Sequence, residues 1–136
     1  MPKLSVWLVR ASLVYFGIGI TLGAVLLAGR GLANGPWIAG LRPLHAELLL
    51  YGWTLQLIMG VAYWILPRFR TGPERGHPTL PWAAFGLLNL GVLLAALGTA
   101  PGSGPSGMLL GRGLETLGAL AFVAHALPRI KAFGTR

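Results

Sequence analysis

The stretch LLLYGWTLQLIMGVAYWIL, residues 48–66, decides the fold, because it runs for 19 residues without a charged side chain. About 20 helical residues cross the hydrocarbon core of a bilayer. The full apolar segment covers about residues 43–66, and similar segments occur near residues 5–29, 80–100 and 107–127. Backbone groups in lipid must be hydrogen-bonded within their own segment, so each segment is expected to be a helix. The sequence predicts an all-α membrane protein with four transmembrane helices.

The composition excludes a soluble globular protein. Of the 136 residues, 54% are hydrophobic and 10% are charged, and the mean hydropathy is +0.69. A soluble domain carries about 25% charged residues. The length allows one domain, which we place at residues 1–136. The sequence contains no cysteine, which excludes disulfides, thiolate metal sites and cysteine nucleophiles.

The basic residues indicate how the helices are oriented. The formal net charge is +8, but the basic residues flank apolar segments rather than follow one face, which is typical of membrane flanks and not of nucleic-acid binding. Eight of the eleven lie at the two ends of the chain and around the second loop, and three lie around the first and third loops. The positive-inside rule then places both termini and the loop at residues 67–78 in the cytoplasm. Short loops predict an antiparallel four-helix bundle.

Small residues recur at helical spacing in two segments. Gly19 and Gly23 form a GxxxG pattern in the first segment, and Gly91 with Ala95 forms a weaker version in the third. This spacing brings helices into close contact. We favour packing inside the bundle over a dimer face as its use.

His45 is the strongest candidate for a ligand. At about 100° per residue, Gly52 and Gln56 share its face of the second helix. The missing side chain of Gly52 predicts a flat slot against the backbone in which a planar macrocycle fits. An imidazole in that position is a natural axial ligand for haem iron. The alternative is an interfacial histidine that is hydrogen-bonded to a loop carbonyl.

Two acids and an arginine form a second polar group. Glu47 points away from His45, and its expected depth matches that of Arg112 in the fourth helix. Arg112 and Glu115 are three residues apart, so they can pair on one helix face. We favour a structural charge network for Glu47, Arg112 and Glu115. A proton relay, or a small proton-coupled transporter built on the two acids, is the functional alternative.

His125 cannot complete a haem site with His45 in the same chain. The two residues lie about 16 residues apart in depth, or about 24 Å at 1.5 Å per residue. Two imidazoles on one iron are only about 4 Å apart, twice a metal–nitrogen bond of about 2 Å. The second ligand of a haem at His45 is therefore expected from another chain or another side chain, or is absent.

The second segment resembles a known helix. LHAEL at residues 44–48, Gly52-Trp53 and GVAYWILPRF at residues 60–69 resemble the second helix of haem-copper oxidase catalytic subunits. The sequence is most similar to the nitric oxide reductase branch and to its short four-span relatives. The likeness is good over about 25 residues and general over the other spans.

The resemblance implies roles for individual residues. In the large enzymes this helix supplies an axial histidine to the low-spin haem, and His45 occupies the matching position. Arg42 and Arg112 lie where haem propionates are paired in the family arrangement. The large subunits have about twelve spans, and the histidines that hold their active-site haem and its partner metal have no counterpart here. Short relatives often carry a second histidine where this sequence has Glu47.

These observations predict a multi-pass haem b protein of the bacterial inner membrane, with His45 as the axial iron ligand. We expect it to act as a homodimer in respiratory electron transfer or haem-based sensing, and not as a complete oxygen or nitric oxide reductase. The alternative is a haem-free accessory or assembly subunit of a haem-copper oxidase or nitric oxide reductase complex.

Overall fold

The computed structural model describes residues 1–29, 36–69, 73–99 and 105–130, and these residues are helical apart from short connecting segments. The helices are α1 (Lys3–Ala28), α2 (Pro36–Glu47), the π-helix η1 (Leu48–Leu55), α3 (Gln56–Ile65), α4 (Thr79–Gly98), α5 (Pro105–Ala126) and the 3-10 turn η2 (Leu127–Arg129). Because α2, η1 and α3 follow one another without a break, they form one long helix. The prediction of an all-α membrane protein is confirmed.

Four helices are long and apolar enough to cross a membrane: Lys3–Ala28, Gly40–Ile65, Thr79–Gly98 and Pro105–Arg129. They expose large apolar side chains such as Leu27, Leu97 and Leu109 on their outer faces. A lipid environment favours such exposure, which water would penalise.

The second helix begins at Pro36 rather than near Pro43. Proline is favoured at the first position of a helix, where its missing N–H is not needed. Pro36 takes that position, and Pro43 lies inside the helix. Of the two prolines, the one that comes first in the sequence starts the helix.

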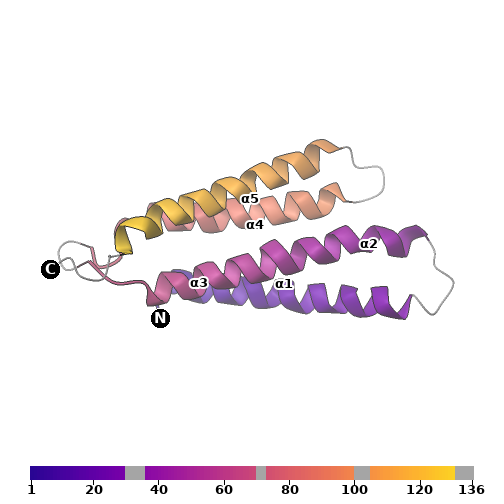
Figure 1. The fold of residues 1–136 in the computed structure, drawn as a ribbon, viewed down its shortest axis with the longest axis horizontal. Helices are drawn as coiled ribbons and strands as arrows, with labels where there is room; N and C mark the ends of the chain where they lie inside the picture. Colours follow the sequence, from indigo (N-terminus) through magenta and orange to yellow (C-terminus); the bar gives the residue numbers. More distant parts are fainter. Residues whose placement is uncertain (30–35, 70–72, 100–104, 131–136) are drawn as a thin grey trace.

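The four helices form two antiparallel hairpins that lie side by side (Figure 1). In the first hairpin, α1 packs along α2, η1 and α3, and in the second, α4 packs closely on α5. Contacts between the hairpins are fewer and are made mainly by α4 against α2 and η1. The chain enters α1 and leaves α5 at the same end of the molecule, which we call the terminal end. Its assignment to the cytoplasm stays a prediction.

Glycine explains why α4 and α5 approach so closely. A Cβ on Gly91 would lie 2.8 Å from the Gly111 carbonyl oxygen, and one on Gly98 would lie 2.5 Å from the Met108 backbone nitrogen. Such distances leave no room for a side chain at either position. The weaker Gly91 and Ala95 pattern is therefore used for packing inside the chain.

Candidate functional site

His45 lies on α2 and points toward α1. Its Nδ1 is 2.8 Å from the carbonyl oxygen of Gly19. A carbonyl oxygen can only accept, so Nδ1 carries the proton and donates it, and Nε2 of the neutral ring keeps its lone pair. Histidines that bind metals are commonly oriented by such a bond from the other ring nitrogen. The partner is a helix carbonyl and not the loop carbonyl of the alternative interpretation.

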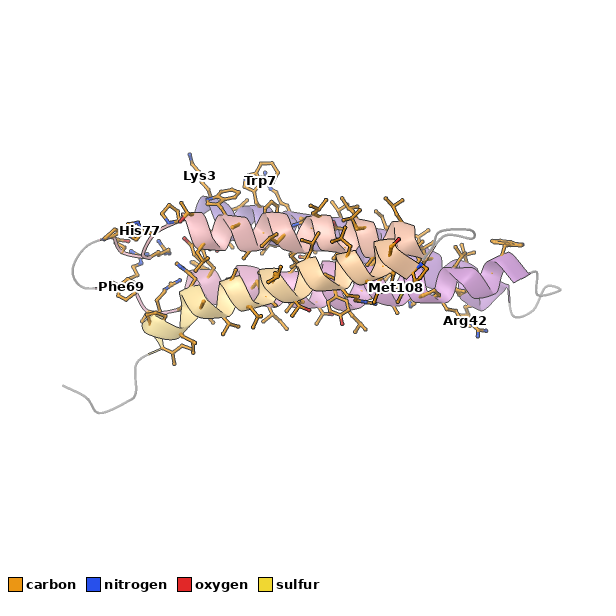
Figure 2. The ribbon with its side chains drawn as sticks, turned by 90° about the horizontal axis from the view of Figure 1, so that it is seen from above. Lys3, Trp7, Arg42, Phe69, His77 and Met108 are labelled. Carbon is orange, nitrogen blue, oxygen red and sulfur yellow. The ribbon has the colours of Figure 1, made fainter. Side chains whose placement is uncertain are left out.

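A groove of about 380 Å³ lies beside this imidazole, between α1 and α2. It is lined by Gly23, Leu26, Leu27, Arg42 and His45. Arg42 precedes His45 by three residues, and Figure 2 shows it at the end of the molecule opposite Lys3 and His77. The groove therefore combines one imidazole, one exposed guanidinium and an apolar wall.

Gly23 makes room for the imidazole. A Cβ on Gly23 would lie 2.8 Å from Cε1 of His45 and 3.3 Å from Nδ1. One turn earlier, a Cβ on Gly19 would meet the side chain of Leu49 at 2.5 Å. Both glycines of the GxxxG pattern in α1 thus contact the second helix, so the prediction of packing within the bundle is confirmed. The part that Gly19 and Gly23 play in orienting His45 was not predicted, although the pattern itself was visible.

Gly52 and Gln56 also face α1, but they lie outside the groove. The Tyr15 ring occupies the space beside Gly52, where a Cβ would lie 2.6 Å from Cγ of Tyr15. Gln56 is fully buried, and its Nε2 is 3.5 Å from the Leu8 carbonyl oxygen. The expected flat slot beside Gly52 is therefore filled, because an aromatic ring of the neighbouring helix takes the volume that the glycine leaves.

Arg112 lies on the other side of the second helix from His45. Its Nη2 is 2.6 Å from Oε2 of Glu47, and its Nη1 is 3.1 Å from Oε2 of Glu115. Its guanidinium carbon lies 4.6 Å from the centroid of the Tyr51 ring. The predicted network of Glu47, Arg112 and Glu115 and the opposite directions of His45 and Glu47 are confirmed. The structure does not bring Arg112 to the groove beside His45.

The two acids are well buried, each with about 2% of its surface exposed. One oxygen of each, Oε1, has no hydrogen-bond partner among the described residues. The network joins α2 of the first hairpin to α5 of the second. It therefore acts as a buried polar link between the hairpins.

His125 lies near the terminal end. Its ring is buried and sits 5.5 Å from the ring of Tyr63, centroid to centroid. His45 lies at the opposite end, so the two imidazoles of one chain are far apart, as the sequence predicted. In the described parts of the chain, no three His, Asp or Glu side chains gather into a metal site. The groove offers a single imidazole as a metal ligand.

Comparison with known proteins identifies the family of the chain. The family model described as "Cytochrome C and Quinol oxidase polypeptide I" matches residues 3–128, which is nearly the whole chain. No curated protein and no solved structure matches the chain.

Proposed function

The chain belongs to the cytochrome c and quinol oxidase polypeptide I family, that of haem-copper oxidase subunit I, and we propose from this membership that it binds haem b through His45. Its role is respiratory electron transfer or haem-based sensing in the bacterial inner membrane. The nitric oxide reductase-like branch is the proposed part of the family. We further propose that the chain is not by itself a complete oxygen or nitric oxide reductase.

The hydrogen bond from His45 Nδ1 to Gly19 carries this proposal. It holds the imidazole in the tautomer whose Nε2 binds metal, in a ring orientation supported by α1. Gly23 leaves space for the ring, and Arg42 supplies a positive charge in the same groove for a propionate carboxylate. When bound, haem would supply reversible one-electron chemistry. The proposed site is the groove between α1 and α2, and it includes neither Gly52 nor Gln56 nor Arg112.

We propose a homodimer because the groove contains only one imidazole. A two-fold axis places His45 of a second copy at the same depth in the membrane, and closed two-fold symmetry is the commonest arrangement of oligomers. Leu27 and Arg42 in the lining of the groove are exposed, so a second copy can reach it. The expected stoichiometry is one haem for two chains.

A reduced-minus-oxidised absorption spectrum of the protein purified in mild detergent tests the proposal. We expect a b-type band that His45→Ala abolishes. Gly23→Ala should lower haem affinity by about 10- to 100-fold, the usual effect of losing a group that orients a metal ligand. Gly17→Ala is the matched control, because a Cβ on this α1 glycine meets nothing within 4 Å, and it should bind haem like the wild type.

Two outcomes would contradict the proposal. A preparation that stays colourless after addition of haem would exclude haem binding. A b-type band that persists in His45→Ala would show that another residue holds the iron.

A haem-free accessory subunit of a respiratory oxidase or nitric oxide reductase is the second candidate. One observation favours it: the Tyr15 ring fills the space beside Gly52, so the slot expected there for a haem is closed. If the chain has this function, it should co-purify with an oxidase or nitric oxide reductase, and His45→Ala should leave that interaction intact.

A further inference from the structure

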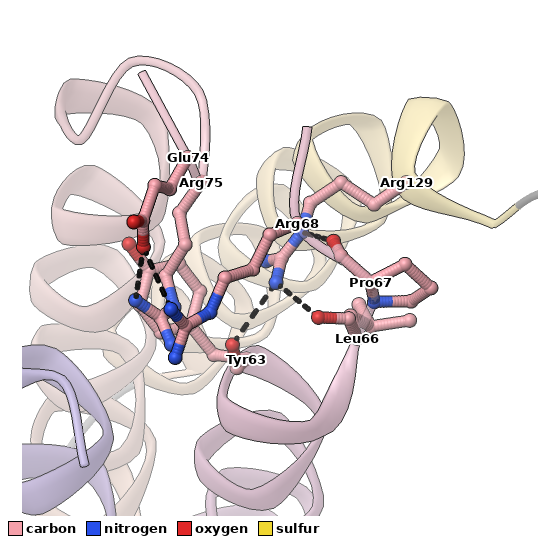
Figure 3. A network of polar contacts seen from close by, with 7 residues as sticks. All are labelled: Tyr63, Leu66, Pro67, Arg68, Glu74, Arg75 and Arg129. Carbon is pink, nitrogen blue, oxygen red and sulfur yellow. Dashed lines mark hydrogen bonds and ion pairs between the residues drawn. The ribbon is translucent and has the colours of Figure 1, made fainter. Parts of the chain in front are cut away.

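Two arginines pair with one glutamate at the terminal end of the molecule, and a third arginine lies near them (Figure 3). Nη1 of Arg68 is 2.9 Å from Oε2 of Glu74, and Nη1 of Arg75 is 3.9 Å from the same oxygen. The loop that carries them is closed by a bond from the Phe69 N–H to the Glu74 carbonyl oxygen at 2.8 Å. We call Arg68, Arg75 and Arg129 the arginine cluster.

Arg129 is the buried member of the cluster, with 1% of its surface exposed. Its Nε donates to the Pro67 carbonyl oxygen at 3.0 Å, and its Nη2 donates to those of Leu66 at 2.8 Å and Tyr63 at 3.2 Å. These carbonyls belong to the end of α3, where a helix carries a partial negative charge. A partial charge does not neutralise a guanidinium, and no carboxylate of the described residues pairs with Arg129.

The cluster therefore has excess positive charge and unused donors. Two of its three guanidiniums share the carboxylate of Glu74, the third bonds to carbonyl oxygens, and the charges of Arg75 and Arg129 are close enough to repel each other. Nε of Arg75 and Nη1 of Arg129 are buried without a hydrogen-bond partner among the described residues. Buried polar groups almost always have a partner, so these two donors indicate that an acceptor with negative charge belongs beside them.

The position of the cluster suggests which anion this is. Arg68 follows the end of α3 by three residues, and Arg129 ends the fourth spanning segment, so the cluster lies where spanning helices leave the hydrocarbon. Lipid phosphates lie at this depth. The planar donor fork of arginine fits phosphate oxygens well.

We propose that the arginine cluster binds the phosphate group of an anionic phospholipid. Glu74 occupies the place of that anion in the structure. It is exposed, with 63% of its side chain accessible, so Arg68 and Arg75 can exchange its carboxylate for a phosphate.

Native mass spectrometry of the full-length protein in non-ionic detergent tests this site with two lipids, phosphatidylglycerol and phosphatidylcholine. We expect tighter binding of phosphatidylglycerol, with one lipid bound per chain. Arg75→Gln should weaken this binding at least about tenfold, the effect of one charge-assisted hydrogen bond. Glu74→Gln removes the competing carboxylate and should strengthen it about two- to fivefold, which corresponds to an exposed ion pair.

Arg10→Gln is the matched control. It removes the same charge from an exposed position of α1 near the terminal end, outside the cluster, and should change the affinity less than about twofold. Equal effects of Arg75→Gln and Arg10→Gln, or equal binding of the two lipids, would overturn the proposal. Inorganic phosphate is added in competition to separate the two sources of phosphate. Displacement of phosphatidylglycerol by millimolar phosphate would overturn the assignment to a lipid.

Discussion

Among the described residues, Arg112 is the cation that pairs with both buried acids. It pairs with Glu47 and Glu115, which are both about 2% exposed. Arg112→Gln leaves two buried carboxyl groups without a cation. We expect the free energy of unfolding to fall by about 2–3 kcal/mol, near the lower end for loss of one partner of a buried pair, because the Arg112 side chain is itself 37% exposed.

Unfolding of the purified protein by denaturant in detergent measures this loss. Arg10→Gln is the comparison, since it removes an exposed arginine and should have almost no effect. Equal stability of the wild type and Arg112→Gln would show that the acids are stabilised without Arg112.

At the scale of residues, the sequence predicted the directions of side chains on one helix and the pair of Glu47 with Arg112, whose depths match and whose charges are opposite. It missed the apolar contacts between helices. Residues two positions apart on a helix point in nearly opposite directions, so the separation of His45 and Glu47 was predictable. Residues three positions apart lie on one face, so the pairing of Arg112 with Glu115 was predictable as well. The place of Tyr15 against Gly52 was not predictable, because hydropathy does not indicate which face of α1 meets the second helix.

At the scale of elements, the close contact between α4 and α5 depends on glycine. A Cβ on Gly111 would collide with the backbone of Ala95 and lie 2.7 Å from the Gly91 carbonyl oxygen. Backbone atoms cannot rotate away as a flexible side chain can. We expect Gly111→Ala to lower the free energy of unfolding by about 1–3 kcal/mol, as overpacking does.

Gly113→Ala on the same helix is the control for this prediction, because its Cβ meets nothing within 4 Å. Alanine is the better helix former, so this variant should be as stable as the wild type or slightly more stable. Equal free energies of unfolding for Gly111→Ala and Gly113→Ala would contradict this prediction and show that α4 and α5 separate easily.

The π-helix η1 is the element that the sequence did not predict. Its eight residues, Leu48–Leu55, form the first part of the uncharged run that predicted a spanning helix. A long apolar segment is predicted to be helical, because backbone groups in lipid must be hydrogen-bonded within the segment. It does not distinguish the α from the π pattern of bonds, since both satisfy that requirement. π-Segments inside α-helices are frequent at functional sites, and η1 follows His45 by three residues.

At the scale of the whole molecule, the two hairpins are joined by a few polar contacts. The Tyr15 hydroxyl donates to Oδ1 of Asn89 at 3.1 Å, Glu47 pairs with Arg112, and Arg129 bonds to the carbonyls at the end of α3. Hydrogen bonds to a charged group contribute about 1.5–3 kcal/mol each. Arg129→Gln should therefore let the hairpins move apart at the terminal end.

Spin labels test this separation without background, because the sequence contains no cysteine. Cysteines introduced at the exposed residues Ile65 and Leu127 report the distance between the hairpins. We expect Arg129→Gln to broaden their distance distribution. A second pair at Leu97 and Leu109, within the α4–α5 hairpin, should keep its distribution, and broadening of both pairs would indicate general unfolding instead.

The composition of the groove has a consequence for the order of events during synthesis. Its lining residues come from α1 (Gly23, Leu26 and Leu27) and from α2 (Arg42 and His45). Chains are made from the N-terminus at about 5–20 residues per second, so these parts are made well before α4 and α5. The first hairpin can enter the bilayer with His45 already oriented, and the haem binding that we propose then need not wait for the second half of the chain.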